Sequence, residues 1–363
     1  MPASVRVITN HSVMGSRAQV AGRAEWPQGR YLDWMRISCT PSARGPAHAV
    51  AVGVLAVAAA GLSCSGEPVR QPPPVDPEVL AAEHEEWRER RQRSLASPSG
   101  VVSWAGLWEL REGPNPFGSD PALRILLPSE DSPPLAGTLH LTAGVEGDEA
   151  AGLRLVPEPA SGLALRDGGP VDEPIAVAHD RSGNTTFLTL GSLGLRVHAE
   201  RGTDRLWLRA WDTDSPRAAA FELPSYYPVS NEWRLAARFD PYPEPREVPM
   251  ADVTGGTVAN VSPGELVFHA AGREHRLIAF GTETSSSYLV MLRDSTAFVD
   301  TYQLGRYMRV PVADEDGWTV IDFNRAYNPP CAFTPHSVCS FPPRENRLTV
   351  AIRAGEKRPG RSG

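Results

Sequence analysis

Residues 305–357 read GRYMRVPVADEDGWTVIDFNRAYNPPCAFTPHSVCSFPPRENRLTVAIRAGEK, and this stretch holds the densest group of special residues in the chain. Two runs with the pattern of strands, Arg306–Pro311 and Trp318–Phe323, lead into a loop rich in proline, asparagine and cysteine. A last apolar run, Leu348–Arg353, is also expected to form a strand. We therefore place the candidate functional site at this loop and the strand ends beside it.

Polar residues on either side of the loop form the predicted binding site. Asp322, Phe323 and Asn324 alternate polar, apolar and polar at a strand end, so the two polar side chains face the same way. If the strands are neighbours, carboxylates, amides and a guanidinium meet at one rim. The expected ligand-binding residues are Arg306, Asp322, Asn324, Tyr327, Asn328, Glu345 and Asn346. The alternative is structural, because asparagine and acidic residues also cap turns and tie loops to backbone amides.

The rim leaves two classes of function open. The first is a binding or structural protein that uses the rim for an unknown ligand. The second is a hydrolase in which Asp322 or Glu345 acts as general acid or base. The sequence contains no GxSxG elbow, phosphate-binding loop, HExxH motif or dinucleotide-binding glycine set. We expect no cofactor and leave the question of enzymatic activity open.

Two cysteines, Cys331 and Cys339, lie within the loop. In an oxidising compartment the simplest expectation is a disulfide that closes this short segment. Together with His336 the two sulfurs could instead supply three ligands to zinc, which would need a fourth ligand from elsewhere. A free nucleophilic thiol is the third alternative, because His336 lies nearby in the sequence.

Residues 35–63 have the pattern of a secretory signal peptide. Met35 and Arg36 open a short positively charged region, and the apolar run Ala47–Leu62 follows it. This run is short for a membrane span, which needs about 20 apolar residues. Cys64 follows the small residues directly and resembles the cysteine of a bacterial lipobox, which receives a lipid and becomes the mature N-terminus.

The export signal has consequences for both ends of this region. Residues 1–34 show no helix or strand period, so we expect translation to begin at Met35 and the preceding stretch to be non-native. We expect the protein to be exported to the periplasm or the outer cell surface. It would be held at the membrane of the cell envelope by a lipid anchor on Cys64. The alternatives are an ordinary signal peptide and a membrane-anchoring helix.

The rest of the chain predicts an all-β fold preceded by one short amphipathic helix. Asp76 and Pro77 suit the N-cap and the first position of this helix. Beyond it, many short apolar runs alternate with turn residues, as in β-sandwiches and open barrels, and we expect two such units packed together. The expected segments are a proline-rich tether at 64–75, the helix at 76–97, a first β unit at 100–215, a proline-rich and aromatic connector at 216–250, and a second β unit at 251–357.

The charge balance argues against one class of partner. The formal net charge is −7. The first 63 residues contain six arginines against Glu25 and Asp33, a net of +4, so the remaining residues carry −11. An acidic protein without a basic stripe is not expected to bind nucleic acid.

Several motifs together resemble a known family. They are GLWELREGPNPFGSD at 106–120, DPYPEP at 240–245, TYQLGRY at 301–307, DFNRAYNPPCAFTP at 322–335, PPRENRL at 342–348 and AIRAGEK at 351–357. From Val101 onward the chain resembles the bacterial and archaeal family catalogued as domain of unknown function 1684. Members of that family often look like exported lipoproteins, which agrees with Cys64. The family has no assigned reaction, cofactor or catalytic residue, so the resemblance implies architecture but no mechanism.

Overall fold

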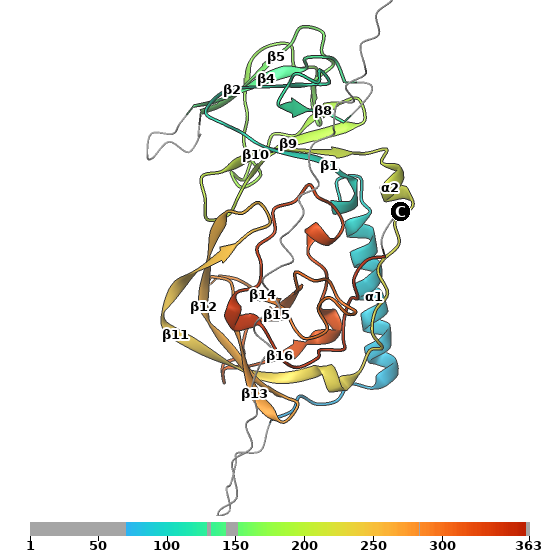
Figure 1. Cartoon of the computed structure of the whole chain (residues 1–363), viewed down its shortest axis with the longest axis vertical. Coiled ribbons are helices and arrows are strands. Elements are labelled where there is room, and N and C mark those ends of the chain that lie inside the picture. Colours follow the sequence, from blue (N-terminus) through green and yellow to red (C-terminus); the bar gives the residue numbers. More distant parts are fainter. Residues whose placement is uncertain (1–69, 129–131, 143–151, 283, 361–363) are drawn as a thin grey trace, which may run out of the picture. The chain divides into compact units, whose positions relative to one another are not determined.

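The computed structural model describes residues 70–128, 132–142, 152–282 and 284–360, coloured along the sequence in Figure 1. The predictions for the upstream extension, the signal peptide and Cys64 concern residues outside these ranges, as does most of the tether. Within the ranges that the structure describes, no helix is long and apolar enough to cross a membrane.

Helix α1, Pro77–Leu95, confirms the helix predicted for residues 76–97. The Asp76 side chain caps it by accepting hydrogen bonds from the backbone N–H groups of Glu78 and Val79, at 2.9 and 3.4 Å. One side of α1 packs against the rest of the fold and the other carries charged residues in water. Its buried residues are Leu80, His84 and Leu95.

The first β unit is a sandwich of two five-stranded sheets. One sheet contains, in spatial order, β1 (Trp104–Glu109), β10 (Leu206–Asp212), β9 (Leu193–Ala199), β8 (Leu188–Leu190) and β6 (Ala164–Leu165). The other contains β3 (Ile125–Leu126), β2 (Gly113–Gly118), β4 (Gly137–Thr142), β5 (Gly152–Pro157) and β7 (Ile175–Ala176). Alternate residues of β5 are buried, as expected for a strand with one face on the core. Leu139 and Leu155 of one sheet and Leu195 and Leu208 of the other share this core.

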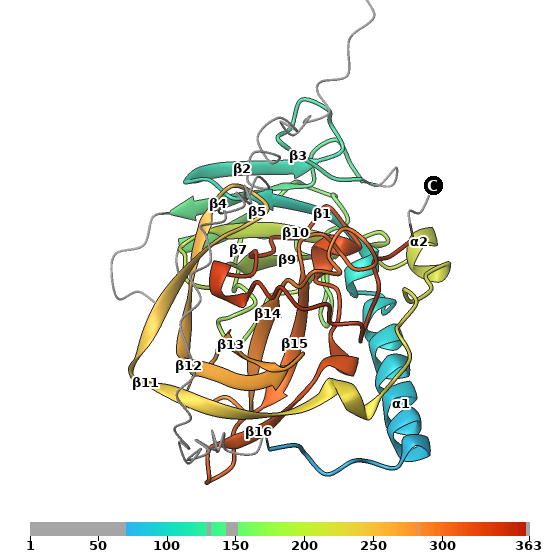
Figure 2. The ribbon, with the colours of Figure 1, turned by 60° about the horizontal axis from the view of Figure 1, so that its bottom comes forward.

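The second β unit is an open barrel. Its strands are β11 (Arg234–Ala251), β12 (Thr257–Ala270), β13 (Arg273–Ala279), β14 (Ser287–Leu292), β15 (Arg306–Pro311) and β16 (Trp318–Asp322). Four of them form a sheet in the order β13-β12-β11-β16, and β14 pairs with β15. A bridge between Phe280 and Leu289 joins β13 to β14, and Thr319 Oγ1 of β16 donates to the Pro311 carbonyl of β15 at 2.9 Å. Figure 2 shows β11 and β12 curving around the shorter strands. The predicted all-β class is confirmed.

The strand β11 differs from the connector that we expected at 216–250. We predicted a strand only over Trp233–Phe239, because several prolines follow it. The structure continues the strand to Ala251 and pairs it with β12. The register shifts between Pro241 and Arg246, and this irregularity accommodates the prolines, which cannot donate to a ladder. Only residues before β11, including the short helix α2 (Pro216–Ala219), are a true connector.

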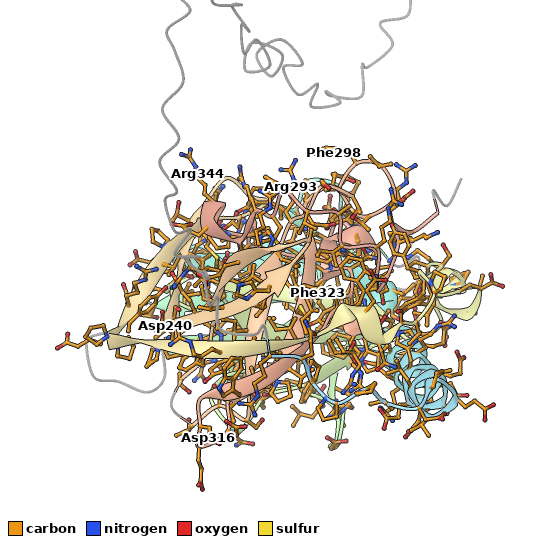
Figure 3. The ribbon with its side chains drawn as sticks, turned by 90° about the horizontal axis from the view of Figure 1, so that it is seen from below. Asp240, Arg293, Phe298, Asp316, Phe323 and Arg344 are labelled. Atoms are coloured by element: carbon orange, nitrogen blue, oxygen red, sulfur yellow. The ribbon has the colours of Figure 1, made fainter. Side chains whose placement is uncertain are left out.

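The last predicted strand, Leu348–Arg353, is not a strand in the structure. The segment is extended, but side chains take up much of its backbone bonding. Ile352 N donates to the Asp294 carboxylate at 2.8 Å, and its carbonyl accepts from Arg306 at 3.0 Å. The apolar residues of the segment nevertheless enter the barrel core beside Phe323, which lies centrally in Figure 3, away from Asp240 and Asp316. They are Leu348 and Ile352, and Ala354 joins the same core just beyond the segment.

Candidate functional site

A buried carboxylate joins α1 to the end of the described chain. Glu356 is fully buried and forms a bidentate ion pair with Arg91, in which each carboxylate oxygen accepts from one guanidinium nitrogen. It also accepts hydrogen bonds from the Tyr226 hydroxyl and from the backbone N–H of Asn328, each at 2.7 Å. A buried charge needs such a complete set of partners. Asn328, a predicted ligand-binding residue, is therefore part of an internal network, and its side-chain amide donates to the Lys357 carbonyl at 2.8 Å.

Arg306 has a similar internal role. Its side chain is fully buried at the start of β15. It pairs with Asp294 at 3.0 Å and donates to the carbonyls of Ile352 and Ala354. The guanidinium thus fixes the terminal segment against the barrel and does not face a ligand.

Two of the predicted ligand-binding asparagines hydrogen-bond to backbone groups instead. Asn324 lies in the helical turn η3 (Phe323–Arg325) and exchanges hydrogen bonds with the backbone of Ser230, at 3.1 and 2.9 Å. Asn346 lies in the turn η5 (Arg344–Asn346) and exchanges hydrogen bonds with the backbone of Ile278, at 2.6 and 3.0 Å. Both asparagines are buried, and each satisfies backbone groups that would otherwise lack hydrogen-bond partners.

The remaining rim residues do not converge. The Asp322 carboxylate accepts from the Asn324 side chain at 2.8 Å and lies 3.6 Å from Arg325. It stands at the end of β16, one edge of the four-stranded sheet, whereas η5 with the exposed Glu345 lies beside β13, the other edge. Tyr327 pairs its backbone with Tyr307 in both directions at 2.8 Å. The structure therefore does not assemble the predicted rim, and most of its members brace the terminal segment.

The two cysteines are free thiols in the structure, so the predicted disulfide is not formed there. They are nevertheless neighbours: the backbone N–H of Cys331 donates to Cys339 Sγ at 3.2 Å. The Ser337 hydroxyl lies 3.7 Å from the same sulfur. No group of three or more His, Cys, Asp or Glu side chains within the described ranges is arranged to hold a metal ion, so the zinc alternative with His336 finds no support.

The surroundings make the two thiols unequal. The pKa of Cys339 is lowered, chiefly because the Cys331 thiol donates a hydrogen bond to it. Donation in that direction, together with burial, raises the pKa of Cys331. The positive charge of Arg209 also lowers the pKa of Cys339; this arginine is 4% exposed and stacks over the Trp104 ring at 3.7 Å. Burial lowers the pKa of Arg209 to about 10.

A groove, which we call the C-terminal groove, lies beside the cysteine loop and has a volume of about 710 Å³. The rings of Phe221 and Phe333 line it and meet edge to face with centroids 5.7 Å apart. Arg217 is fixed at its wall by hydrogen bonds to the carbonyls of Val102 and Trp104, at 3.0 and 2.8 Å. Arg358 lines the other side and is exposed. We did not predict this groove from the sequence, because its residues come from the expected connector and from both ends of the fold.

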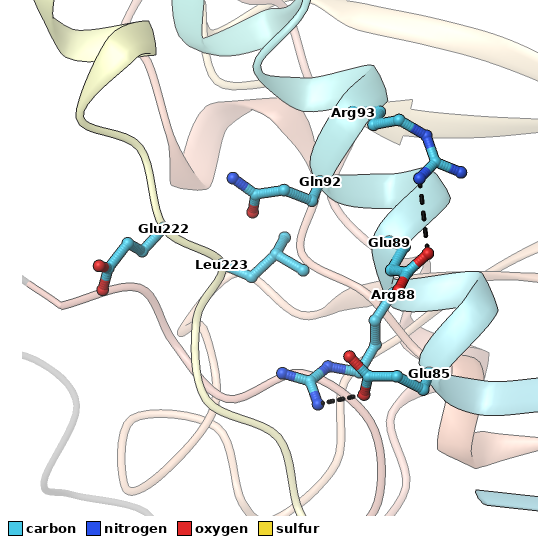
Figure 4. A pocket seen from close by; sticks show the side chains of 7 residues that line it. All are labelled: Glu85, Arg88, Glu89, Gln92, Arg93, Glu222 and Leu223. Atoms are coloured by element: carbon cyan, nitrogen blue, oxygen red, sulfur yellow. Dashed lines mark hydrogen bonds and ion pairs between the residues drawn. The ribbon is translucent and has the colours of Figure 1, made fainter. Parts of the chain in front are cut away.

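A second hollow of about 420 Å³ runs along the charged side of α1 (Figure 4). The charges on its helix wall are paired, Glu85 with Arg88 at 2.9 Å and Glu89 with Arg93 at 3.5 Å, and Glu222 lies on the opposite wall. Such exposed pairs are typical of a solvated helix surface. This hollow therefore has less to offer a ligand than the C-terminal groove.

The fold and the site define an all-β protein with an open C-terminal barrel, whose terminal loop carries a dithiol next to a groove. Residues 219–357 match the model of the family described as "Protein of unknown function (DUF1684)", which supports the family resemblance for this part of the chain. The chain is 29% identical to an uncharacterized protein of Haloarcula marismortui solved by solution NMR. That match covers 39% of this chain and 80% of the other, with a TM-score of 0.34. No curated protein matches the chain.

Proposed function

We propose that the chain is an exported, lipid-anchored protein of the cell envelope, which binds an amphiphilic anion in the C-terminal groove. Export and anchoring rest on the signal-peptide pattern of residues 35–63 and on Cys64. The proline-rich residues before α1 suit a spacer between an anchor and a folded part.

The observation that supports binding is that two arginines and two phenylalanine rings line the same groove. Phe221 and Phe333 offer apolar surface to a hydrocarbon chain. Arg217 and Arg358 have no carboxylate partner among the described residues and can bind a carboxylate or phosphate. Glu222 is the one acidic residue that lines the groove, so its walls favour an anion.

The rim fits the hydrolase alternative less well. A hydrolase that uses Asp322 or Glu345 as general acid or base needs a free carboxyl group beside amides that orient the substrate. Asp322 is engaged by Asn324 and Arg325, and Glu345 lies at the other edge of the sheet.

In an exported protein the neighbouring thiols of Cys331 and Cys339 would be oxidised to the disulfide that the sequence suggested.

Calorimetric titration with dodecanoate, and with dodecanol as the uncharged match, tests the groove. We expect Arg358→Gln to weaken dodecanoate binding about fivefold and to leave dodecanol binding unchanged. Phe333→Ala should weaken both ligands, and Arg344→Gln, an exposed arginine outside the groove, should weaken neither. Equal losses for Arg358→Gln and Arg344→Gln, or no binding of dodecanoate at all, would contradict the proposal.

Anchoring is tested separately by expression in a bacterium that processes lipoproteins. The full chain should incorporate labelled palmitate and partition into detergent, and Cys64→Ala should do neither. A parent chain that stays unlabelled and in the aqueous phase would remove the anchor from the proposal and leave the groove untouched.

A further inference from the structure

The loop between Pro330 and Ser340 holds its two cysteines at a fixed separation. The Tyr302 hydroxyl donates to the Cys331 carbonyl at 2.9 Å, and the Tyr307 hydroxyl donates to the Ser340 carbonyl at 2.7 Å. Both ends of the loop are thus attached to the barrel side of the fold. A dithiol held in this way can close to a disulfide with little movement of the chain, since the two residues already share a hydrogen bond.

We propose that Cys331 and Cys339 form a thiol–disulfide exchange site, in which Cys331 accepts a mixed disulfide from a small disulfide compound and Cys339 resolves it. This inference goes beyond a static disulfide, because it assigns an entry residue, a resolving residue and a class of co-reactant. It does not depend on export or on a ligand in the C-terminal groove.

The order of the two residues follows from their exposure. Cys331 is partly exposed in the helical turn η4, Pro330–Ala332, directly before the groove residues Ala332 and Phe333. Cys339 is 5% exposed. A disulfide compound must approach the attacking sulfur closely and in line, so it reaches Cys331 first.

The buried cysteine, Cys339, is placed to hold the negative charge of a thiolate and to accept the proton that Cys331 gives up. Cys339 Sγ receives the backbone N–H of Cys331 and lies near the Ser337 hydroxyl, so a negative charge there is stabilised. Arg209 adds a buried positive charge, and its Nε atom finds no hydrogen-bond partner within the described residues. The Asp180 carboxylate is the stronger counter-charge of Arg209, and a thiolate at Cys339 adds a second negative charge that stabilises the buried guanidinium. The lowered pKa of Cys339 agrees with this arrangement.

The reaction balances in two steps. Cys331 passes its proton toward Cys339, attacks one sulfur of RSSR and forms Cys331–S–S–R, and the proton leaves with the first thiol, RSH. Cys339 then attacks the Cys331 sulfur, the protein disulfide forms, and a second RSH leaves with the remaining thiol proton. The dithiol is oxidised by two electrons and the disulfide compound is reduced to two thiols.

The test uses the full chain with Cys39→Ser and Cys64→Ser in every sample, so that the pair alone reacts. The reduced protein is treated with oxidised glutathione and followed by intact mass and peptide mapping. We expect the parent to form the internal disulfide without a lasting adduct. Cys339→Ser should accumulate glutathione on Cys331, and Cys331→Ser should react at least about tenfold more slowly.

Several outcomes would overturn the proposal. The first is a glutathione adduct on Cys339 of the Cys331→Ser variant that forms as fast as the adduct on Cys331 of the Cys339→Ser variant. The second is a lasting adduct on the parent, and the third is a folded parent that does not react.

Circular dichroism confirms that each variant is folded. If a variant does not fold, brief alkylation of the reduced parent followed by mapping still decides the order, and labelling of Cys339 before Cys331 contradicts it. In denaturant both cysteines should react alike, which serves as the control for intrinsic reactivity.

Discussion

Arg91 and Glu356 form a two-pronged ion pair across 265 residues of sequence, with side-chain exposures of 14% and 0%. The pair ties the only long helix of the described residues to the segment that ends the fold. The guanidinium also donates to the Asn328 carbonyl at 3.0 Å and stacks over the Tyr327 ring at 4.7 Å. One side chain on α1 therefore holds two parts of the terminal stretch together, residues 327–328 and Glu356.

Removal of this guanidinium should destabilise the fold strongly. Arg91→Ala leaves the Glu356 charge buried without its cation, and we expect a loss of about 3–5 kcal/mol in the free energy of unfolding. Denaturant titration measures it. Arg93→Ala on the same helix removes an exposed pair with Glu89, and its effect should stay within about 0.5 kcal/mol. Similar losses for the two variants would show that the buried pair is not a main support of the terminal segment.

Two adjacent residues of the predicted rim should behave in opposite ways. Asn346→Leu removes three hydrogen bonds, to Ile278 N, Ile278 O and Met291 O, and leaves buried backbone groups without partners. We expect it to lower the free energy of unfolding by about 3 kcal/mol, measured by denaturant titration. Glu345→Ala changes an exposed side chain and should stay within about 0.5 kcal/mol. A stable Asn346→Leu variant would return this amide to the list of ligand candidates.

Local signals in the sequence were sufficient to predict where several helices and strands lie. Asp76 and Pro77 mark the start of α1, and β15 has the bounds predicted for it, Arg306–Pro311. These signals depend on neighbouring residues, through capping and alternation, and need no knowledge of the partners. The same reasoning placed a strand at Leu348–Arg353, where the bonding partners are the distant side chains of Asp294 and Arg306.

Whether a polar side chain is buried or exposed could not be predicted in this way. Glu345 and Asn346 are neighbours of similar polarity, yet one is exposed and the other is fully buried against β13. The difference depends on contacts with Ile278, 68 residues away. For the same reason the C-terminal groove was not foreseen, since Val102, Phe221 and Phe333 meet there only after folding.

His84 gives the fold a defined response to acid. It is 4% exposed on α1, packs against the rings of Trp87 and Tyr226, and its Nε2 atom lies 2.8 Å from the Asn324 carbonyl. Burial lowers its pKa, although the Asn324 carbonyl and Asp322 act in the opposite sense. The folded state therefore binds the proton more weakly than the unfolded chain. The stability from neutral His84 is complete above the unfolded pKa of about 6.5 and is lost as the pH falls below it.

We therefore expect the free energy of unfolding to rise with pH below about 6.5, with His84 contributing a slope of at most about 1.4 kcal/mol per pH unit. Urea titrations at several pH values measure this slope. His84→Gln keeps a hydrogen-bond donor for the Asn324 carbonyl but has no titrating ring, so its slope should be shallower by the contribution of one proton. His269→Gln, at an exposed position on β12, should retain the slope of the parent. A His84→Gln variant with an unchanged slope would mean that the acid response comes from other groups, because removal of a weakly protonated buried imidazole must reduce the proton uptake on unfolding.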